Sequence, residues 1–280
     1  MEMNSLFSHP HDRATVRLLQ NAHADHIEAS YRGLLSLANN PEQVIIQHFG
    51  PVRTFIAAGH RFENRAIFTR AESPEQIDAV LQHFIARQSN LVIEINPANF
   101  YVDPPRTWEK RLLNHLLVRG CRIEDFRCVW FYRKSDELTH PHRINAFLPH
   151  QVDEYIHFAT QVDASAKWTA ANRAAAAIPG KLHYVAFDES GTPAAVGGLF
   201  INNQAAYLSW WYTRPECRGQ GFQRAGIQRR VRDALAAGCT HMFSVTDFNY
   251  ASPRNLQACG FALAYNYLLL RRDPLPLEPA

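Results

Sequence analysis

Long hydrophobic runs are absent from this sequence of 280 residues. No run approaches the roughly 18 apolar residues that a membrane-spanning helix needs. Residues 1–19 carry charges and histidines throughout and lack an apolar centre, so they do not resemble a secretory signal peptide. These absences predict a cytoplasmic protein with no membrane partner.

Paired cysteines, basic tracts and complete sets of metal ligands are missing as well. The five cysteines are widely spaced without a C-x-x-C pair, which favours reduced thiols. The formal net charge of +3 comes from scattered basic residues, so no nucleic-acid partner is predicted. His23 and His26 have no third ligand nearby, so we interpret them as surface histidines of a frayed terminus and expect no metal.

The remaining composition is that of a soluble globular protein, with 46% hydrophobic and 20% charged residues. Its C-terminal half contains five runs that are rich in aromatic and β-branched residues. These runs predict strands at residues 181–187, 194–201, 205–212, 241–245 and 261–270.

Two helices are predicted between these strands. The first follows Gly221, and its buried face consists of apolar residues at helical spacing: Ile227, Val231, Ala234 and Leu235. The polar side of this helix is expected to face solvent: Arg229, Arg230, Arg232 and Asp233. A second, short helix begins at Ser252-Pro253 and ends at Gly260.

The turn Arg218-Gly219-Gln220-Gly221 precedes the first of these helices and is the most informative motif of the chain. Glycine allows the backbone to approach a ligand closely and to adopt positive φ, so successive N–H groups can point into one concavity. The N-terminus of the following helix adds unpaired donors and the positive end of its dipole. The motif therefore predicts a cradle for a phosphate or pyrophosphate.

Residues 153–273 resemble the GNAT superfamily of acyl-CoA-dependent N-acetyltransferases. The family signature Gln/Arg-x-x-Gly-x-Gly/Ala matches Arg218 and Gly221, whereas Gln223 stands where the family prefers a small residue. The segment SPRNLQACGF resembles the second signature of part of the superfamily. The resemblance implies a mixed α/β fold, in which helices flank a mostly antiparallel sheet.

The resemblance also implies acetyl-CoA as the co-substrate and places its binding residues. These are Trp211, Tyr212, Thr213, Arg218, Gly219, Gln220, Gly221, Phe222, Gln223, Arg224, Asn249, Ser252 and Asn255. The strand that contains Trp210 and Trp211 lies along the pantetheine arm in this family. One tryptophan is expected in the core and the other at the acyl or acceptor pocket, and the sequence leaves open which is which.

The N-terminal half has no glycine-rich cradle, but its predicted order of strands and helices, β-β-α-β-α-β, closely matches that of the C-terminal half, which has one more strand at its start. This order favours two GNAT-like halves, the first of them degenerate. The predicted domains are residues 1–139, a linker at 140–152, the acyl-CoA-binding domain at 153–273 and a tail at 274–280. The N-terminal half is expected to wall the acceptor pocket, or alternatively to serve as a scaffold or a dimerisation surface.

The catalytic groups are less clear, because many family members have a tyrosine as general acid where this chain has Leu256. Tyr250 and Tyr265 are candidates to replace it. Asp247, Glu94 and Glu63 are candidates for the base that accepts the proton of the amine. Glu94 lies within an apolar strand, so it is either paired for structural reasons, for instance with Arg65, or faces the acceptor pocket.

The sequence therefore predicts acetyl transfer to a primary amine of a small-molecule or amino-acid-like acceptor, by direct attack in a monomer or homodimer. The alternative is a non-catalytic sensor that binds acyl-CoA. A transferase that uses aminoacyl-tRNA is disfavoured, since it would not need an intact cradle and would need a strongly basic face.

Overall fold

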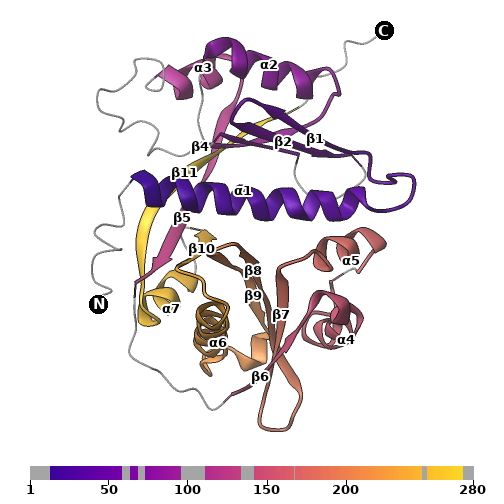
Figure 1. The fold of residues 1–280 in the computed structure, drawn as a ribbon, viewed down its shortest axis with the longest axis vertical. Helices are drawn as coiled ribbons and strands as arrows, with labels where there is room; N and C mark the ends of the chain where they lie inside the picture. Colours follow the sequence, from indigo (N-terminus) through magenta and orange to yellow (C-terminus); the bar gives the residue numbers. More distant parts are fainter. Residues whose placement is uncertain are drawn as a thin grey trace. The chain divides into compact units, whose positions relative to one another are not determined.

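The computed structural model describes residues 13–58, 64–68, 73–95, 111–133, 142–166, 168–247 and 251–273. They divide into two compact units, whose elements are labelled in Figure 1. Unit 1 comprises the described residues up to Gly33 together with Cys128–Ala264, and unit 2 comprises Leu34–Arg127 and the described residues from Tyr265 onward. Strand β5 (Arg122–Tyr132) begins in unit 2 and ends in unit 1, whereas β11 (Phe261–Arg272) begins in unit 1 and ends in unit 2.

Unit 1 contains a sheet in the order β6-β7-β8-β9-β10-β5-β11. Its own strands are β6 (Arg143–Phe147), β7 (Lys181–Phe187), β8 (Pro193–Asn202), β9 (Ala205–Thr213) and β10 (His241–Asp247). Neighbours from β6 to β9 are antiparallel, and β9 is parallel to β10. The predicted strands of the C-terminal half are confirmed, and β6 is an additional strand.

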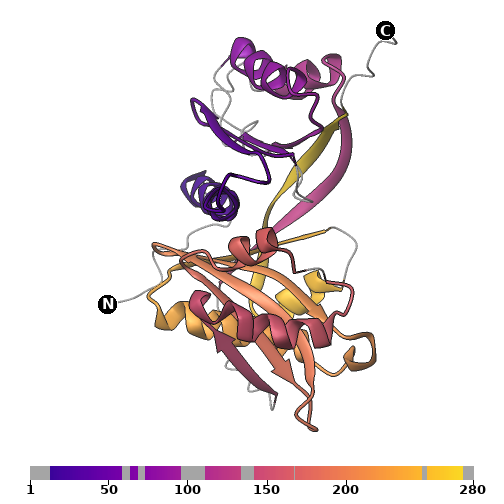
Figure 2. The same ribbon diagram turned by 90° about the vertical axis from the view of Figure 1, so that its right-hand side faces the viewer.

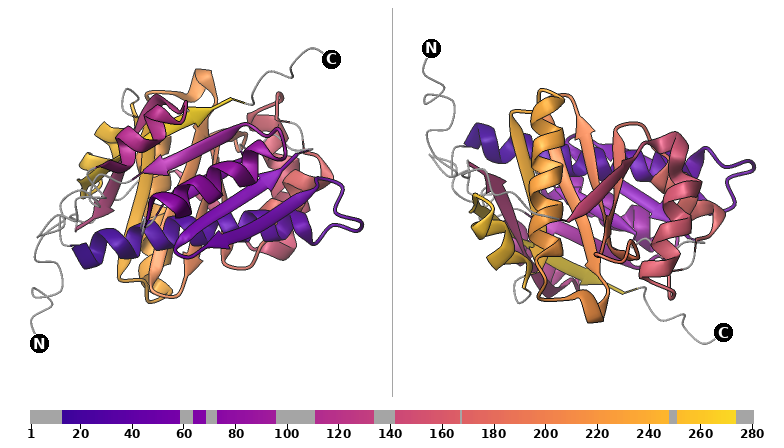
Figure 3. Two further views of the ribbon diagram at one scale, coloured as in Figure 1. Left: turned by 90° about the horizontal axis from the view of Figure 1, so that it is seen from above. Right: turned by 90° about the horizontal axis from the view of Figure 1, so that it is seen from below.

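Helices cover both faces of this sheet, because alternate residues of a strand point to opposite sides. Helix α6 (Phe222–Ala236) packs on the side of Tyr184 and Ala186, and lies over the strands in the right-hand view of Figure 3. Helix α4 (Val152–Val162) packs on the opposite side, with Val185 and Phe187. The remaining helices of unit 1 are α5 (Ala170–Ala176) and α7 (Ser252–Ala258).

The N-terminal helix α1 (Arg13–Leu35) belongs to unit 1 as far as Gly33. Asn202 Nδ2 donates a hydrogen bond to Asp25 Oδ2 at 3.0 Å, and the His26 ring lies 4.9 Å from that of Tyr207. The expectation that His23 and His26 are surface histidines of a frayed terminus was therefore wrong. The helix uses them to pack on aromatic side chains, and residues 1–139 do not form one domain.

The predicted linker at residues 140–152 also needs correction. Residues 134–141 lie outside the described residues, but Arg143–Phe147 form β6, which pairs with β7. A 3₁₀ helix at Pro149–Gln151 then leads into α4. The five residues RINAF are too few for their alternation to identify a strand in the sequence. They form a strand because they pair with β7.

His183 of β7 is a buried group with a strongly shifted pKa. It is 2% exposed, its Nε2 lies 2.9 Å from the carbonyl oxygen of Ala176, and its ring stacks on Tyr155 at 4.3 Å. Burial lowers the pKa of His183 from 6.5 to about 4, and the nearby Lys181 acts in the same direction. The folded protein therefore holds this imidazole neutral at pH values where an unfolded chain binds a proton.

We expect stability to fall as the pH is lowered from 6.5 to about 4, and His183→Gln to remove part of this slope. Only the unfolded chain protonates this histidine in that window. The part of the free energy of unfolding that comes from keeping His183 neutral is therefore fully present above pH 6.5 and is lost by about pH 4. One proton corresponds to about 1.4 kcal/mol per pH unit. Urea unfolding at several pH values measures the slope. The exposed His157→Gln is the control, and an unchanged slope in His183→Gln would contradict the assignment.

Unit 2 repeats the architecture of unit 1 on a smaller scale. Its elements are β1 (Val44–Phe49), β2 (Val52–Ala57), β3 (Arg65–Phe68), α2 (Pro74–Ile85), β4 (Leu91–Ile95) and α3 (Leu112–Val118). Its strand order is β1-β2-β3-β4-β11-β5, and α2 and α3 lie on one side of these strands (Figure 2). The core between strands and helices includes Phe68, Leu81, Phe84, Ile93 and Leu116.

The internal duplication predicted from the sequence is confirmed. Both halves contain β-β-β-α-β-α-β, and in both the three consecutive strands are antiparallel while the third is parallel to the fourth. The sequence prediction for the first half omitted β3, which has only four residues. Among the described residues, no helix is long and apolar enough to cross a membrane.

Glu94 forms the predicted ion pair with Arg65 in unit 2. The Arg65 Nη1 to Glu94 Oε1 distance is 2.5 Å, and the two side chains are 23% and 6% exposed. β3 and β4 are parallel neighbours, so both side chains belong to adjacent strands. This contact accounts for a carboxylate in an otherwise apolar strand.

Glu94→Gln is expected to lower the free energy of unfolding by about 2 kcal/mol and to leave acetyl-CoA affinity unchanged. Removing one partner of a fully buried pair costs about 3–5 kcal/mol, and the partial exposure of Arg65 reduces that figure. Asp273→Asn is the control, because its pair with Arg122 is 59% and 61% exposed and should contribute little. A Glu94→Gln variant with full stability would show that the pair is not structural.

Candidate functional site

The turn before α6 adopts the backbone conformation that its glycines allow. Gly219 and Gly221 have φ of 80° and 87°, and Gly221 is the N-cap of α6 without any side chain to cap it. The first N–H groups of a helix have no partner within the helix, so those after Gly221 remain available. A Cβ atom at Gly219 would meet nothing within 4 Å, which leaves open space over the turn.

Beside this turn, β9 and β10 separate. Their parallel pairing joins only Ala205–Leu208 to His241–Ser244, whereas β9 continues to Thr213 and β10 to Asp247. The side chain of Arg218 reaches back to this part of β9, where its Nε donates to the carbonyl oxygen of Thr213 at 3.3 Å. The gap between β9 and β10 therefore lies next to the glycine turn. An extended ligand with a phosphate group at one end could contact both places at once.

β9 also carries a β-bulge at the point where it separates from β10. Gly197 pairs with Trp211 and Leu199 with Leu208, so two residues of β9, Ser209 and Trp210, stand opposite the single residue Gly198. A bulge leaves an extra residue unpaired in the ladder. The candidate site thus combines the glycine turn, the fork between β9 and β10, and a bulge whose extra residue lies outside the regular ladder.

The sequence of residues 146–261 matches the model of the acetyltransferase (GNAT) family, whose members use acetyl-CoA as co-substrate. Residues 146–261 form a GNAT domain. The match begins in β6 and ends at the start of β11, so it contains the turn, the fork and the bulge. No curated protein matches the chain.

Solved GNAT structures are similar to both halves of the chain. A GCN5-related N-acetyltransferase from Kribbella flavida has a TM-score of 0.60 at 14% sequence identity, over 91% of this chain and 95% of its own. A tandem GNAT protein from the clavulanic acid biosynthesis pathway has a TM-score of 0.59 at 12% identity, over 96% and 98%. At these identities the likeness shows the fold alone, and it confirms the tandem arrangement.

The two tryptophans of the GNAT domain's β9 have different environments. The Trp211 ring lies between Gly197 of β8 and Gly226 of α6, where a Cβ atom at either glycine would overlap it. Its Nε1 donates to Thr213 Oγ1 at 3.2 Å. Trp210 is 46% exposed. Trp211 is therefore the tryptophan that packs inside the domain.

Gln223, which departs from the family signature, joins the two helix N-termini of the GNAT domain. Its Nε2 donates to Ser252 Oγ at 2.9 Å, and its Oε1 accepts from Asn255 Nδ2 at 2.6 Å. Arg224 Nε donates to Asn255 Oδ1 at 3.0 Å. Four of the predicted cofactor-binding residues thus form one hydrogen-bonded group, and the larger side chain of Gln223 has a structural partner.

The other predicted binding residues have different environments, and not all of their side chains can reach a ligand. Phe222 is buried in the core and stacks on His142 at 4.0 Å, so only its backbone is available to a ligand. Gln220 Nε2 donates to the carbonyl oxygen of Glu216, and the Tyr212 ring lies 6.0 Å from the Arg218 guanidinium. Asn249 falls outside the described residues, as do the catalytic candidates Tyr250 and Glu63.

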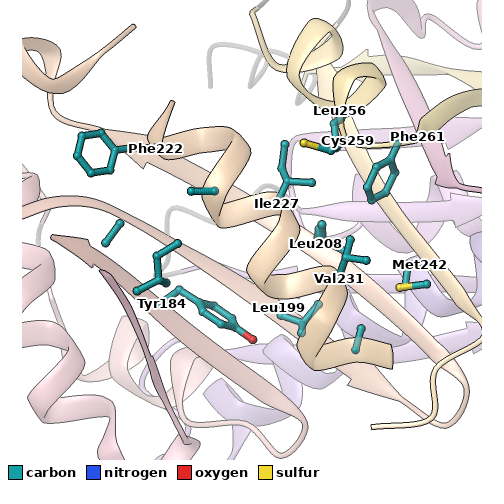
Figure 4. Close-up of a cluster of buried hydrophobic side chains, with 14 of the residues drawn as sticks. Tyr184, Leu199, Leu208, Phe222, Ile227, Val231, Met242, Leu256, Cys259 and Phe261 are labelled. Carbon is teal, nitrogen blue, oxygen red and sulfur yellow. The ribbon is translucent and has the colours of Figure 1, made fainter. Parts of the chain in front are cut away.

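The described catalytic candidates do not come together. Asp247 ends β10 at the fork and is half-buried. Tyr265 belongs to unit 2, where burial and the Glu94 carboxylate raise its pKa and make it a weaker proton donor. Leu256 of α7 is buried in the same core cluster as Cys259 and Ile227 (Figure 4), and its apolar side chain cannot act as an acid.

No group of three or more His, Cys, Asp or Glu side chains in the described part of the chain is arranged to hold a metal ion. All five cysteines are buried free thiols. Among them is Cys217, which packs in the core next to the turn and contacts Arg214 Nη2 at 3.4 Å. Its burial agrees with a packing role.

The sequence analysis missed Arg230, which was expected to face solvent but is only 2% exposed. Its Nε donates to the carbonyl oxygen of Gly226 at 3.0 Å, and its Nη1 donates to those of Gly198 at 3.0 Å and Ser209 at 2.8 Å. Leu235, expected in the core, is 52% exposed. Helical spacing contained the signal, since residue 230 lies three positions after the buried Ile227.

Proposed function

We propose that the protein transfers an acetyl group from acetyl-CoA to a primary amine of a small-molecule acceptor. The observation that carries this proposal is the glycine turn of positive φ at the N-terminus of α6, beside the fork between β9 and β10. The turn suits the pyrophosphate, and the fork admits the pantetheine arm between the strands. The family match supports acetyl-CoA as the donor.

The reaction is a direct transfer in a ternary complex. The amine nitrogen attacks the thioester carbonyl carbon, a C–N bond forms, the C–S bond breaks and CoA leaves as the thiolate. Negative charge develops on the carbonyl oxygen, and a backbone N–H of β9 at the bulge stabilises it. Holding both reactants in contact supplies a further large part of the rate.

Two protons must also move. An amine acceptor is largely protonated at neutral pH, so a base or a water must accept its proton before attack. We assign this role to Asp247, since it ends β10 at the fork, and the protonation of the thiolate to Tyr250 or to water. Leu256 excludes the tyrosine position that many family members use.

The second candidate function is a sensor that binds acyl-CoA without turnover, in the same monomeric or homodimeric cytoplasmic protein. Leu256 favours it, because the position of the usual general acid is apolar. Gln223 no longer favours it, because its amide is satisfied by Ser252 and Asn255. A transferase for aminoacyl-tRNA would not need the glycine turn.

Incubation with acetyl-CoA and a panel of primary amines separates these functions. The release of CoA thiol is followed with a thiol reagent, and acetylated products are identified by mass spectrometry. The proposal expects thiol release that depends on at least one amine and an equal amount of acetylated amine. Tight binding of acetyl-CoA without amine-dependent release would favour the sensor.

A further inference from the structure

Arg230 is a buried cation at the bulge of β9. Among the described residues no carboxylate contacts its guanidinium, and Arg229 and Asp233 on the same helix pair with each other instead. Its hydrogen bonds go to three carbonyl oxygens, one of α6 and two of the sheet. Burial lowers the pKa of Arg230 to about 10, so the side chain remains charged at neutral pH.

The two sheet carbonyls belong to the residues that interrupt the ladder. Gly198 is the single residue of β8 at the bulge, and Ser209 is one of the two residues of β9 opposite it. The same Nη1 atom donates to both, at 3.0 and 2.8 Å. The guanidinium therefore replaces strand-to-strand hydrogen bonds at the one place where β8 and β9 do not pair regularly.

The position of the guanidinium is fixed on its other sides as well. It lies 4.9 Å from the centroid of the Trp211 ring, a cation–π distance, and that ring is enclosed by Gly197 and Gly226. Through Arg230, the helix, the indole and the bulge are therefore joined by direct contacts.

We propose that Arg230 is a positioning residue that holds the β9 bulge in the conformation needed to polarise the thioester carbonyl. The inference rests on the proposed function, because it assigns to the bulge the N–H that stabilises the developing oxyanion. By fixing the Ser209 carbonyl, the guanidinium fixes the peptide planes beside Trp210. Its uncompensated positive charge also favours negative charge on the ligand at this point.

The test uses the full chain with Arg230→Lys and Arg230→Met, and acetyl-CoA isotopically labelled at the acetyl carbonyl carbon. The infrared band of the bound carbonyl reports its polarisation and needs no acceptor. Wild type should shift this band to lower frequency than in water, and both variants should move it back toward the solution value. The affinity of both variants for CoA, which lacks the thioester carbonyl, should change by less than about 3-fold. Their kcat with an active amine should fall about 10-fold or more.

Arg229→Met on the same helix is the matched control. It breaks the ion pair with Asp233 and a hydrogen bond to the Ile144 carbonyl of β6, and Arg229 does not contact the bulge. It should leave the carbonyl band unchanged. Folded Arg230 variants that bind acetyl-CoA with the wild-type band would overturn the inference. If Arg230→Met does not fold, Arg230→Lys decides alone, because it retains the charge but replaces the planar guanidinium by a single donor nitrogen. Failure of the wild type to bind acetyl-CoA would instead overturn the proposed function.

Discussion

Gly221→Glu is expected to weaken acetyl-CoA binding about 100-fold or more while the chain remains folded. Gly221 has a φ of 87°, and an L-residue with a side chain loses roughly 1–2 kcal/mol in this conformation. The new carboxylate would also stand where the pyrophosphate belongs, and like charges in contact cost several kcal/mol. Isothermal titration calorimetry with acetyl-CoA measures the effect.

Gly238→Glu is the matched control for this variant. Gly238 has a φ of 80°, a Cβ atom there would meet nothing within 4 Å, and the residue follows the opposite end of the same helix. It therefore introduces the same backbone strain and the same charge far from the turn. Retained affinity in Gly238→Glu together with lost affinity in Gly221→Glu is the expected pair of results. Equal affinity in both would exclude the turn as the phosphate cradle.

Gly226→Ala is expected to destabilise the protein by about 3 kcal/mol, the upper range for overpacking a core. Helix propensity alone favours alanine over glycine by about 1 kcal/mol, so the sign of the effect decides which contribution dominates. A Cβ atom at Gly226 would overlap the Trp211 ring, which Gly197 blocks from the other side. The ring is enclosed on both of these sides, so overlap should outweigh propensity.

A second substitution tests the cause. Trp211→Leu removes the ring, so adding Gly226→Ala to it should cost far less than in the wild type. The double variant would then be more stable than the sum of the two single effects predicts. Urea unfolding of the four proteins provides the cycle. If Gly226→Ala is more stable than wild type, the close packing of α6 on Trp211 is wrong.

Elements with a regular pattern could be predicted from the sequence. The runs around Val185, Leu208 and Leu269 are long and apolar, and each is a strand in the structure. β3 and β6 have four and five residues, which is too short for a period to appear, and they become strands through pairing with β2 and β7. The assignment of α1 to unit 1 depends on contacts such as Asn202 with Asp25, far apart in the chain.

Some residues of the candidate site could also be predicted from the sequence, and others could not. The turn at Gly219 and Gly221 could be predicted because glycine itself encodes positive φ. Arg230 could not, because a charged residue on an amphipathic helix is normally expected to face solvent. Only the spatial convergence of three carbonyl groups makes its burial favourable, and those groups come from three different elements.

Equilibrium dialysis with labelled acetyl-CoA tests the central claim most directly, because it counts sites per chain. Only the GNAT domain of unit 1 has the glycine turn, whereas the segment between β3 and α2, residues 69–73, contains no glycine. We therefore expect one acetyl-CoA per chain, lost in Gly221→Glu. No binding, or two acetyl-CoA molecules per chain, would contradict the account.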